Sequence, residues 1–320
     1  TRYKYQPLEY ELGKEVRLVV LHPGAFDDEL YCEILHKNLK DNPEYHAVSY
    51  TWANRFGDAT LKKAISCKNG GQIPITESCE GALRRIRLRG LRRVIWVDML
   101  SIDQQNIQER NHQVSLMKDI YSSATQVLVD LGEGDAEADF IFNEVAHLSS
   151  DRGSASRKSL EMFFERRWFH RVWVLQEIAL AQYATIFCGT MSVNWGSLTS
   201  FMSRKSTEFD KGSFESILPT VFQLRTTSIK TWSHARLLDL LVASRACQST
   251  DPRDKIYALL SLLDPHTPVP IEVDYSQSAS SLFLQVAIWC VNSRKDWNIL
   301  LHVHQPLSLP SLPSWAPDWT

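Results

Sequence analysis

The pattern of hydrophobic and polar residues predicts a strand, a polar loop, an amphipathic helix and a second strand within residues 92–132. The apolar run Val94–Val97 is typical of a buried strand and is followed by Asp98. Apolar residues then recur at helical spacing from Ile107 to Ala124, and Gln126–Leu131 returns to a strand pattern. This order indicates two parallel strands buried on both faces. The polar loop that begins at Asp98 would then lie at the carboxyl edge of the sheet, where ligands bind in open α/β folds.

The same patterning predicts further elements along the chain. Additional strands are expected at Val16–Leu21, Leu30–Leu35, Tyr45–Trp52 and Thr185–Phe187. Helices are expected at about 77–89 (capped by Thr76), 160–181, 235–246, 252–263 and 278–292. We therefore predict an α/β core over residues 1–200, with a mostly parallel sheet flanked by helices. A mainly helical region follows over residues 201–320.

The end of the sequence carries several prolines and tryptophans. Three prolines within residues 310–317 are incompatible with a regular helix or central strand. We expect an extended strap there, with Trp315 and Trp319 packed against the body of the protein.

Composition narrows the class of protein. Hydrophobic residues make up 44% of the chain, charged residues 22%, and the net charge is −2, as in a soluble globular protein. A balanced charge favours neither nucleic acid nor an anionic membrane as a partner. No apolar run is long enough to span a bilayer and no signal-peptide pattern opens the sequence, so we expect a cytoplasmic protein.

The sequence lacks the usual metal, phosphate and hydrolase motifs. Its six cysteines form no CxxC pair, which favours buried, reduced thiols over a disulfide frame or a zinc site. The ten histidines show no HExxH spacing, so no metal site is expected. P-loop, GxGxxG and GxSxG patterns are also absent in their required contexts. A bound dinucleotide would therefore be a substrate, not a resident cofactor.

Several stretches together resemble the fungal heterokaryon-incompatibility (HET) domain. These are Tyr45–Trp52, Trp96–Gln104 with Glu109-Arg110 and Met117–Ala124, Arg171–Glu177, Thr250–Leu260, Asp274-Tyr275, and Pro313–Trp319. The resemblance covers nearly the whole chain. Ala53 departs from the usual glycine, and Ser101 stands where a cysteine is common.

This resemblance implies a cytosolic domain that triggers programmed cell death when incompatible fungal strains fuse. It also implies a distant similarity to Toll/interleukin-receptor (TIR) domains, which share a flavodoxin-like sheet. Some TIR domains cleave NAD with a glutamate placed four residues after a tryptophan, and Trp173 and Glu177 have that spacing. NAD or a related nucleotide is the substrate implied, and a homo-oligomer or a death-signalling protein is the partner implied.

Glu177 is the candidate catalytic residue on chemical grounds as well. On one continuous helix, His170, Trp173 and Glu177 would share a face. A fixed carboxylate could bind ribose hydroxyls and stabilise the oxocarbenium-like transition state of NAD cleavage, since nicotinamide leaves as a neutral molecule. The alternative is a structural ion pair with Arg166, Arg167 or Arg171.

Other polar residues are expected at the same edge of the sheet. Ser49, Tyr50 and Trp52 leave one strand there and could shape a nucleotide pocket together with Asp98 and Asp103. The alternatives are core packing for Trp52, an Asx turn at Asp98, and a helix cap at Asp103 or Asn106.

Two functions therefore remain open. A pocket that brings Glu177 near Asp98 and Trp52 favours an NAD-cleaving effector. A Glu177 locked in an arginine pair under packed side chains favours a non-catalytic signalling module.

Overall fold

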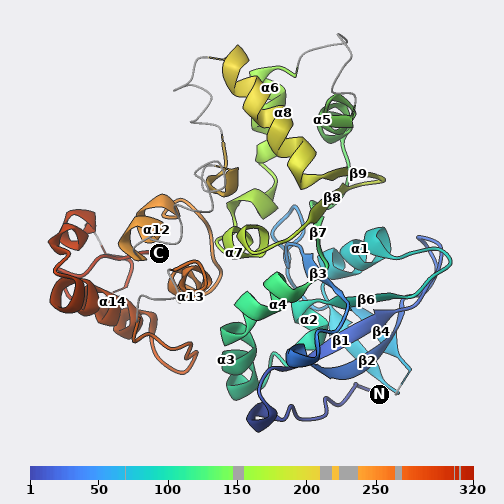
Figure 1. The fold of residues 1–320 in the computed structure, drawn as a ribbon, viewed down its shortest axis with the longest axis horizontal. Helices are drawn as coiled ribbons and strands as arrows, with labels where there is room; N and C mark the ends of the chain where they lie inside the picture. The colour runs from blue at the N-terminus through green and yellow to red at the C-terminus, as the bar shows by residue number, and fades with distance from the viewer. Residues whose placement is uncertain are drawn as a thin grey trace.

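The computed structural model describes most of the chain (Figure 1). The described residues are 1–68, 70–146, 155–209, 218–222, 237–263, 269–305, 307–309 and 311–320.

A nine-stranded mixed sheet forms the centre of the described fold. Its strands are β1 (Glu15–Leu21), β2 (Tyr31–Asn38), β3 (His46–Ser49), β4 (Lys63–Cys67), β5 (Gln72–Ile75), β6 (Arg93–Trp96), β7 (Gln126–Asp130), β8 (Ala184–Cys188) and β9 (Met191–Asn194). Their order across the sheet is β5-β4-β2-β1-β6-β3-β7-β8-β9. With helices on both sides of this sheet, the predicted α/β class is confirmed.

The parallel part of the sheet lies at its centre. Strands β6, β3, β7 and β8 run parallel to one another, and β2 pairs in parallel with β4. Antiparallel pairs join β1 to β2 and β6, β4 to β5, and β8 to β9. The two strands of the predicted strand–helix–strand unit, β6 and β7, are parallel as expected, but β3 lies between them.

Helices cover the sheet and extend the chain beyond it. They are α1 (Glu77–Ile86), α2 (Asp98–Ser101), α3 (Ile107–Ser115), α4 (Met117–Ser123), α5 (Ala136–Ala146), α6 (Arg157–Phe164), α7 (Val174–Ala179), α8 (Trp195–Glu208), α12 (Leu237–Ala243), α13 (Asp254–Leu260) and α14 (Ala279–Arg294). Short 3-10 helices occur at Tyr10–Leu12 (η1), Leu39–Asp41 (η2), Arg167–His170 (η3) and Trp297–His302 (η4).

The strand period of two divides the core between the two faces of the sheet. On β1, Leu18 belongs to one apolar cluster and Val19, the next residue, to the other. The smaller cluster contains the buried face of α1. The larger one continues from the sheet through α5, α6 and α7 into the C-terminal helices and ends at Trp319. The helical region thus shares its apolar core with the α/β part.

Helix α1 begins as predicted and ends earlier. The Thr76 hydroxyl accepts a hydrogen bond from Cys79 N at 3.1 Å, which caps the first turn. The helix ends at Ile86 because Arg87 is extended and its guanidinium binds carbonyls of the loop at residues 25–29. The helix predicted at 235–246 is α12, and its predicted start lies outside the described residues.

The helix predicted over residues 160–181 is wrong, because the chain breaks it twice. Helix α6 ends at Phe164, η3 follows, and α7 begins only at Val174. Residue Gln248 fixes the second break: Gln248 N donates to His170 O at 2.5 Å, and Val172 N donates to Gln248 O at 3.0 Å. Pairing with a distant segment therefore prevails over local helical spacing.

The C-terminal strap has no helix or strand in its described residues, as predicted. Trp319 is buried at 1% exposure, and Arg245 lies over its ring at 5.1 Å. The expectation for Trp315 is wrong, because 43% of this residue is exposed. A turn closed by Ala316 N and Pro313 O, 3.0 Å apart, interrupts the extended path at this residue.

Candidate functional site: a buried carboxylate centre

The end of β3 meets α7 at the carboxyl edge of the parallel strands. Ser49 is the last residue of β3, and its hydroxyl donates a hydrogen bond to Oε2 of Glu177 on α7. The Trp168 indole N–H donates to the Ser49 oxygen at 2.7 Å. Ser49 is 1% and Glu177 3% exposed, so this chain of hydrogen bonds is enclosed by protein. It fixes the orientation of the carboxylate.

Arg171 provides positive charge beside this carboxylate. Its Nη1 lies 3.8 Å from Glu177 Oε2 and donates to the carbonyl oxygen of Tyr50 at 2.5 Å. Of the three arginines considered from the sequence, Arg171 is therefore the one next to Glu177. Arg166 instead binds Asp135 at 2.5 Å, and the guanidinium of Arg167 lies beside Gly57.

Asp98 is the second carboxylate of the centre. It begins α2 immediately after β6, and its Oδ2 accepts a hydrogen bond from the Trp52 indole N–H at 2.7 Å. Its Oδ1 accepts one from Met99 N at 2.7 Å. Arg171 lies close enough to act electrostatically on both carboxylates. We call these four residues, Ser49, Asp98, Arg171 and Glu177, the carboxylate centre.

Burial dominates the ionisation of the centre. Loss of hydration raises the pKa of Glu177, and the negative charge of Asp98 raises it further, against the opposing effects of Arg171 and the Ser49 hydrogen bond. Burial likewise raises the pKa of Asp98, while Arg171 and Trp52 oppose that shift. A buried carboxylate and a partly buried one that share one cation form an electrostatically perturbed site of the kind found in functional centres.

Tyrosines close the inner side of the centre. Tyr50 is 2% exposed, and burial together with the charge of Asp98 raises its pKa. Tyr121 lies beneath, with its hydroxyl donating to Val48 O at 3.2 Å. Its pKa is raised by burial and by the charge of Glu177. By contrast Trp52, Asp98 and Arg171 are only partly buried, so the centre is nearest to solvent on their side.

The structure places two predicted site residues away from Glu177. Asp103 N donates to Glu109 at 2.7 Å, and the Asp103 side chain accepts from Gln105 N at 3.2 Å. It therefore takes part in an Asx turn before α3, and Asn106 provides the helix cap through Glu109 N. Trp173 lies beside Asp254 of α13, where it opposes the rise that burial causes in the pKa of Asp254.

The predicted common face of His170, Trp173 and Glu177 is wrong. His170 ends η3 and its ring Nε2 lies 2.9 Å from Phe164 O, whereas Glu177 faces Ser49. The break at residues 171–173 rotates these side chains apart.

Sequence reasoning missed Trp168 as a site residue. It lies within an aromatic segment that looks like ordinary core, and it does pack edge-on against Phe169 and Trp195. Its hydrogen bond to Ser49 depends on a partner 119 residues away in the chain. No local pattern could have indicated that contact.

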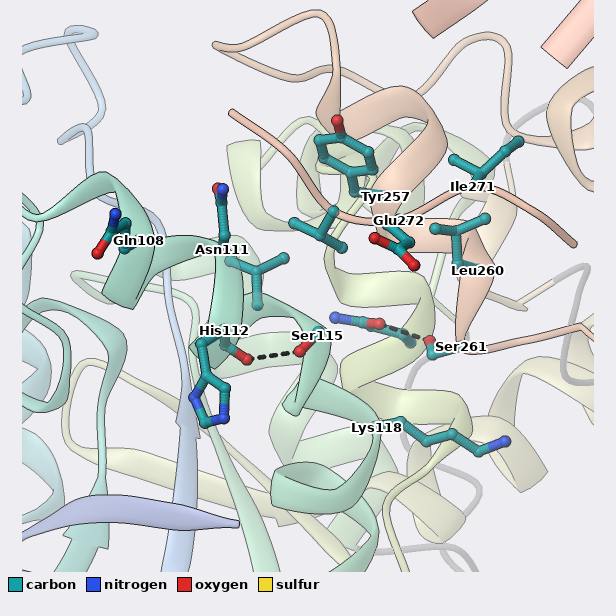
Figure 2. Close-up of a pocket in the computed structure, with 13 residues that line it drawn as sticks. Gln108, Asn111, His112, Ser115, Lys118, Tyr257, Leu260, Ser261, Ile271 and Glu272 are labelled. Carbon is teal, nitrogen blue, oxygen red and sulfur yellow. Dashed lines mark hydrogen bonds between the residues drawn. The ribbon is translucent and has the colours of Figure 1, made fainter. Parts of the chain in front are cut away.

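A separate cavity of about 690 Å³ lies beside the centre, between α3–α4 and the C-terminal region (Figure 2). Asn111, His112 and Ser115 line it from α3, and Ser261 and Glu272 line it from the other side. Its lining includes Gln176 but not Glu177. The Gln176 Oε1 accepts a hydrogen bond from Ser261 at 2.5 Å, so α7 contributes consecutive residues to the cavity and to the carboxylate centre.

Two features are absent from the part of the chain that the structure describes. The described residues contain no group of three or more histidine, cysteine, aspartate or glutamate side chains positioned to hold a metal ion. Among them, no helix has the length and apolar character needed to cross a membrane.

Comparison with known proteins shows which family and which relative the chain resembles. Residues 45–177 match the family described as Heterokaryon incompatibility protein (HET). The chain is also 28% identical over 396 aligned positions to Heterokaryon incompatibility protein 6, OR allele, of Neurospora crassa. That alignment covers 95% of this chain and 57% of the relative, so the chain spans little more than half of the relative's length. No solved structure matches.

The fold and the centre thus define an α/β protein with a carboxylate pair, Glu177 buried and Asp98 partly buried, at the carboxyl edge of its sheet. The family match begins at β3 and ends at Glu177, so both ends of the matched segment meet in this centre. Residues 45–177 are thus similar to the HET domain, and the chain as a whole is similar to a heterokaryon incompatibility protein.

Proposed function

We propose that this protein is a HET-domain effector of heterokaryon incompatibility and cell death that cleaves NAD at the nicotinamide–ribose bond. The observation that carries the proposal is the convergence of Glu177, Ser49, Asp98 and Trp52 at the carboxyl edge of parallel strands. Ligands of open α/β sheets bind at this edge. The name of the Neurospora crassa relative supports the biological part of the proposal.

Glu177 has the chemistry that the reaction needs. The bond from ribose C1′ to the nicotinamide nitrogen breaks, and its electron pair leaves with nicotinamide, which becomes neutral. Positive charge remains on the ribose, and a nearby carboxylate stabilises it as in glycoside cleavage. A hydroxyl oxygen then adds to C1′ and releases a proton. Ser49 and Trp168 hold Glu177 in one orientation, so no reorganisation of the carboxylate is required during the reaction.

Arg171 and Asp98 would tune this carboxylate and hold the substrate. Arg171 favours the ionised form of Glu177 against the effect of burial. Asp98 can accept hydrogen bonds from ribose hydroxyls, and Trp52 provides a flat ring beside it. Access would come from the partly exposed side formed by Trp52, Asp98 and Arg171.

The test is nicotinamide release from NAD by purified protein, measured at low and at high protein concentration. Glu177→Gln keeps the size and the contact with Ser49 but removes the negative charge, and we expect a loss of about 100-fold or more. Glu161→Gln is the matched control, because Glu161 is 41% exposed on α6 and pairs with Arg157. Equal rates for folded Glu177→Gln and wild type would remove Glu177 from the proposal.

A second function, a non-catalytic signalling module that assembles with copies of itself or with a death-signalling protein, is supported by a different observation. Glu177 is only 3% exposed and has a cation 3.8 Å away, as a structural ion pair does. In that case folded wild-type protein releases no nicotinamide even when concentrated. Glu177→Gln would then retain cell-death activity in a fungal incompatibility assay as long as the protein remains folded.

A further inference from the structure

Two of the six cysteines lie in direct contact far from the carboxylate centre. Cys32 of β2 and Cys67 of β4 are register partners on neighbouring parallel strands. Their sulfur atoms are 3.5 Å apart, and the residues are 0% and 5% exposed. Both are free thiols. We infer that Cys32 and Cys67 form a redox modification site, which a peroxide converts into an intramolecular disulfide.

The backbone already meets the geometric requirement for this bond. Neighbouring strands lie about 4.7–4.9 Å apart, and disulfides join Cα atoms separated by about 4.4–6.8 Å. The sulfur atoms must approach from 3.5 Å to about 2.05 Å, which side-chain rotation can provide without moving either strand.

The two thiols are chemically unequal. The hydrogen bond between them lowers the pKa of Cys67 and raises that of Cys32. Cys67 is also the more exposed of the two. Cys67 is therefore the residue that an oxidant entering from solvent reaches first, and its thiolate is the reactive form.

The chemical steps balance with a peroxide as the only co-reactant. The Cys67 thiolate attacks the O–O bond of hydrogen peroxide, giving Cys67 sulfenic acid and, after protonation of the leaving hydroxide, one water. The Cys32 sulfur then attacks the sulfenic sulfur, and a second water leaves as the disulfide forms. Two thiols are oxidised, and one peroxide is reduced to two waters.

The position of the pair gives the bond a structural effect. Strands β4 and β5 form one margin of the sheet, and β4 joins β2 through two register pairs, Tyr31 with Ser66 and Cys32 with Cys67. A disulfide would fasten the β4–β5 hairpin to the sheet at this short junction. The segment at residues 50–62 joins Ser49, at the end of β3, to the start of β4. The disulfide would therefore also hold the end of this segment that enters β4.

The experiment uses the whole reduced protein and hydrogen peroxide. After oxidation of the folded protein, free thiols are alkylated under denaturing conditions and peptides are mapped by mass spectrometry. We expect a peptide linked through Cys32 and Cys67, lighter by two hydrogens and cleaved by a thiol reductant. Recovery of both residues as alkylated or over-oxidised cysteines, or linked to other cysteines, would overturn the inference.

Variants separate this pair from general oxidation. Cys67→Ala should lose the linked peptide, whereas Cys188→Ser, a change at another buried cysteine, should retain it, and circular dichroism verifies that both remain folded. Hydrogen exchange supplies a readout on the wild-type protein alone. Exchange of the amides in residues 63–75 should become slower on oxidation and recover on reduction. If the Cys32–Cys67 disulfide forms and the exchange of these amides is unchanged, the proposed fastening of the β4–β5 hairpin is wrong.

Discussion

Replacing Arg17 with methionine should destabilise the protein by about 3–5 kcal/mol, because it leaves a buried carboxylate without its cation. Arg17 lies on β1 and is 0% exposed, and its guanidinium binds both oxygens of Glu109, at 2.5 and 2.9 Å. It also donates to Ser101 O at 3.2 Å and to Gln6 O at 2.6 Å. Glu109 is 2% exposed and would retain the hydrogen bond from Asp103 N.

This loss corresponds to a measurable change in unfolding. For 320 residues, an unfolding entropy of about 2.1 cal/mol/K per residue converts it to a fall of about 4–7 °C in the unfolding temperature. Urea titration followed by circular dichroism measures the same quantity. Lys14→Met is the control: its ion pair with Asp119 is 41% and 34% exposed, so its loss should cost less than about 1 kcal/mol.

A double change tests the reasoning behind the magnitude. Arg17→Met combined with Glu109→Gln removes both charges and keeps an acceptor for Asp103 N, so it should recover more than half of the lost stability. If the single change costs under about 1 kcal/mol, or if the double variant is as unstable as the single one, an unpaired buried charge is not the cause.

Three further predictions concern the site and its surroundings. Burial raises the pKa of Glu177, so the folded state binds this proton more tightly than the unfolded state, and the residue's contribution to stability falls as pH rises above about 4. The unfolding temperature of Glu177→Gln should therefore fall less from about pH 4 to 7 than that of wild type. Parallel profiles of unfolding temperature against pH would contradict the raised pKa. Trp168→Phe removes the indole donor to Ser49 and should cost about 1–2 kcal/mol in urea titration, with a near-zero loss counting against the hydrogen bond. Gly189→Ala should cost about 1–3 kcal/mol, because φ is +56° and a Cβ would lie 2.8 Å from the Gly134 backbone; an unchanged unfolding temperature would argue against that close approach.

Much of the α/β architecture could be predicted, because it follows from local patterns. The run Val94–Val97 differs from β6 by one residue at each end, and Gln126–Leu131 matches β7 to within one residue. Both are short apolar segments bounded by polar residues, and their length and β-branched residues favour a buried strand over a helix. The insertion of β3 between them could not be predicted, because strand order depends on contacts between residues distant in sequence.

The buried environment of Arg17 could not be predicted from the sequence. The sequence pattern predicts a strand over Val16–Leu21 but gives no partner for the arginine within it. In the structure it is fully buried because its partner, Glu109, arrives from α3, 92 residues later. Glu109 also fixes the start of the loop after α2 through Asp103 N, so part of the family signature serves to anchor that loop.

The predicted site residues come from two kinds of element. Ser49 and Asp98 follow from the carboxyl ends of the parallel strands β3 and β6, and Trp52 binds Asp98 there, whereas Glu177 contacts Ser49 from helix α7. Their shared arginine and the Trp168 hydrogen bond arise from the break between η3 and α7, where helical spacing predicted continuity. That break depends on Gln248, which lies beyond the predicted core.

The helical region is therefore part of what positions Glu177, although the family match ends at that residue. Gln248 pairs with the backbone on both sides of Arg171, Asp254 lies beside Trp173 just before α7, and Ser261 donates to Gln176 at 2.5 Å. These contacts fix α7 at its beginning and at the residue next to Glu177. A change in the C-terminal region can thus alter the carboxylate centre through the backbone of α7 without touching the carboxylate itself, and the cavity lined by Gln176 and Ser261 lies at the junction where such a change would act.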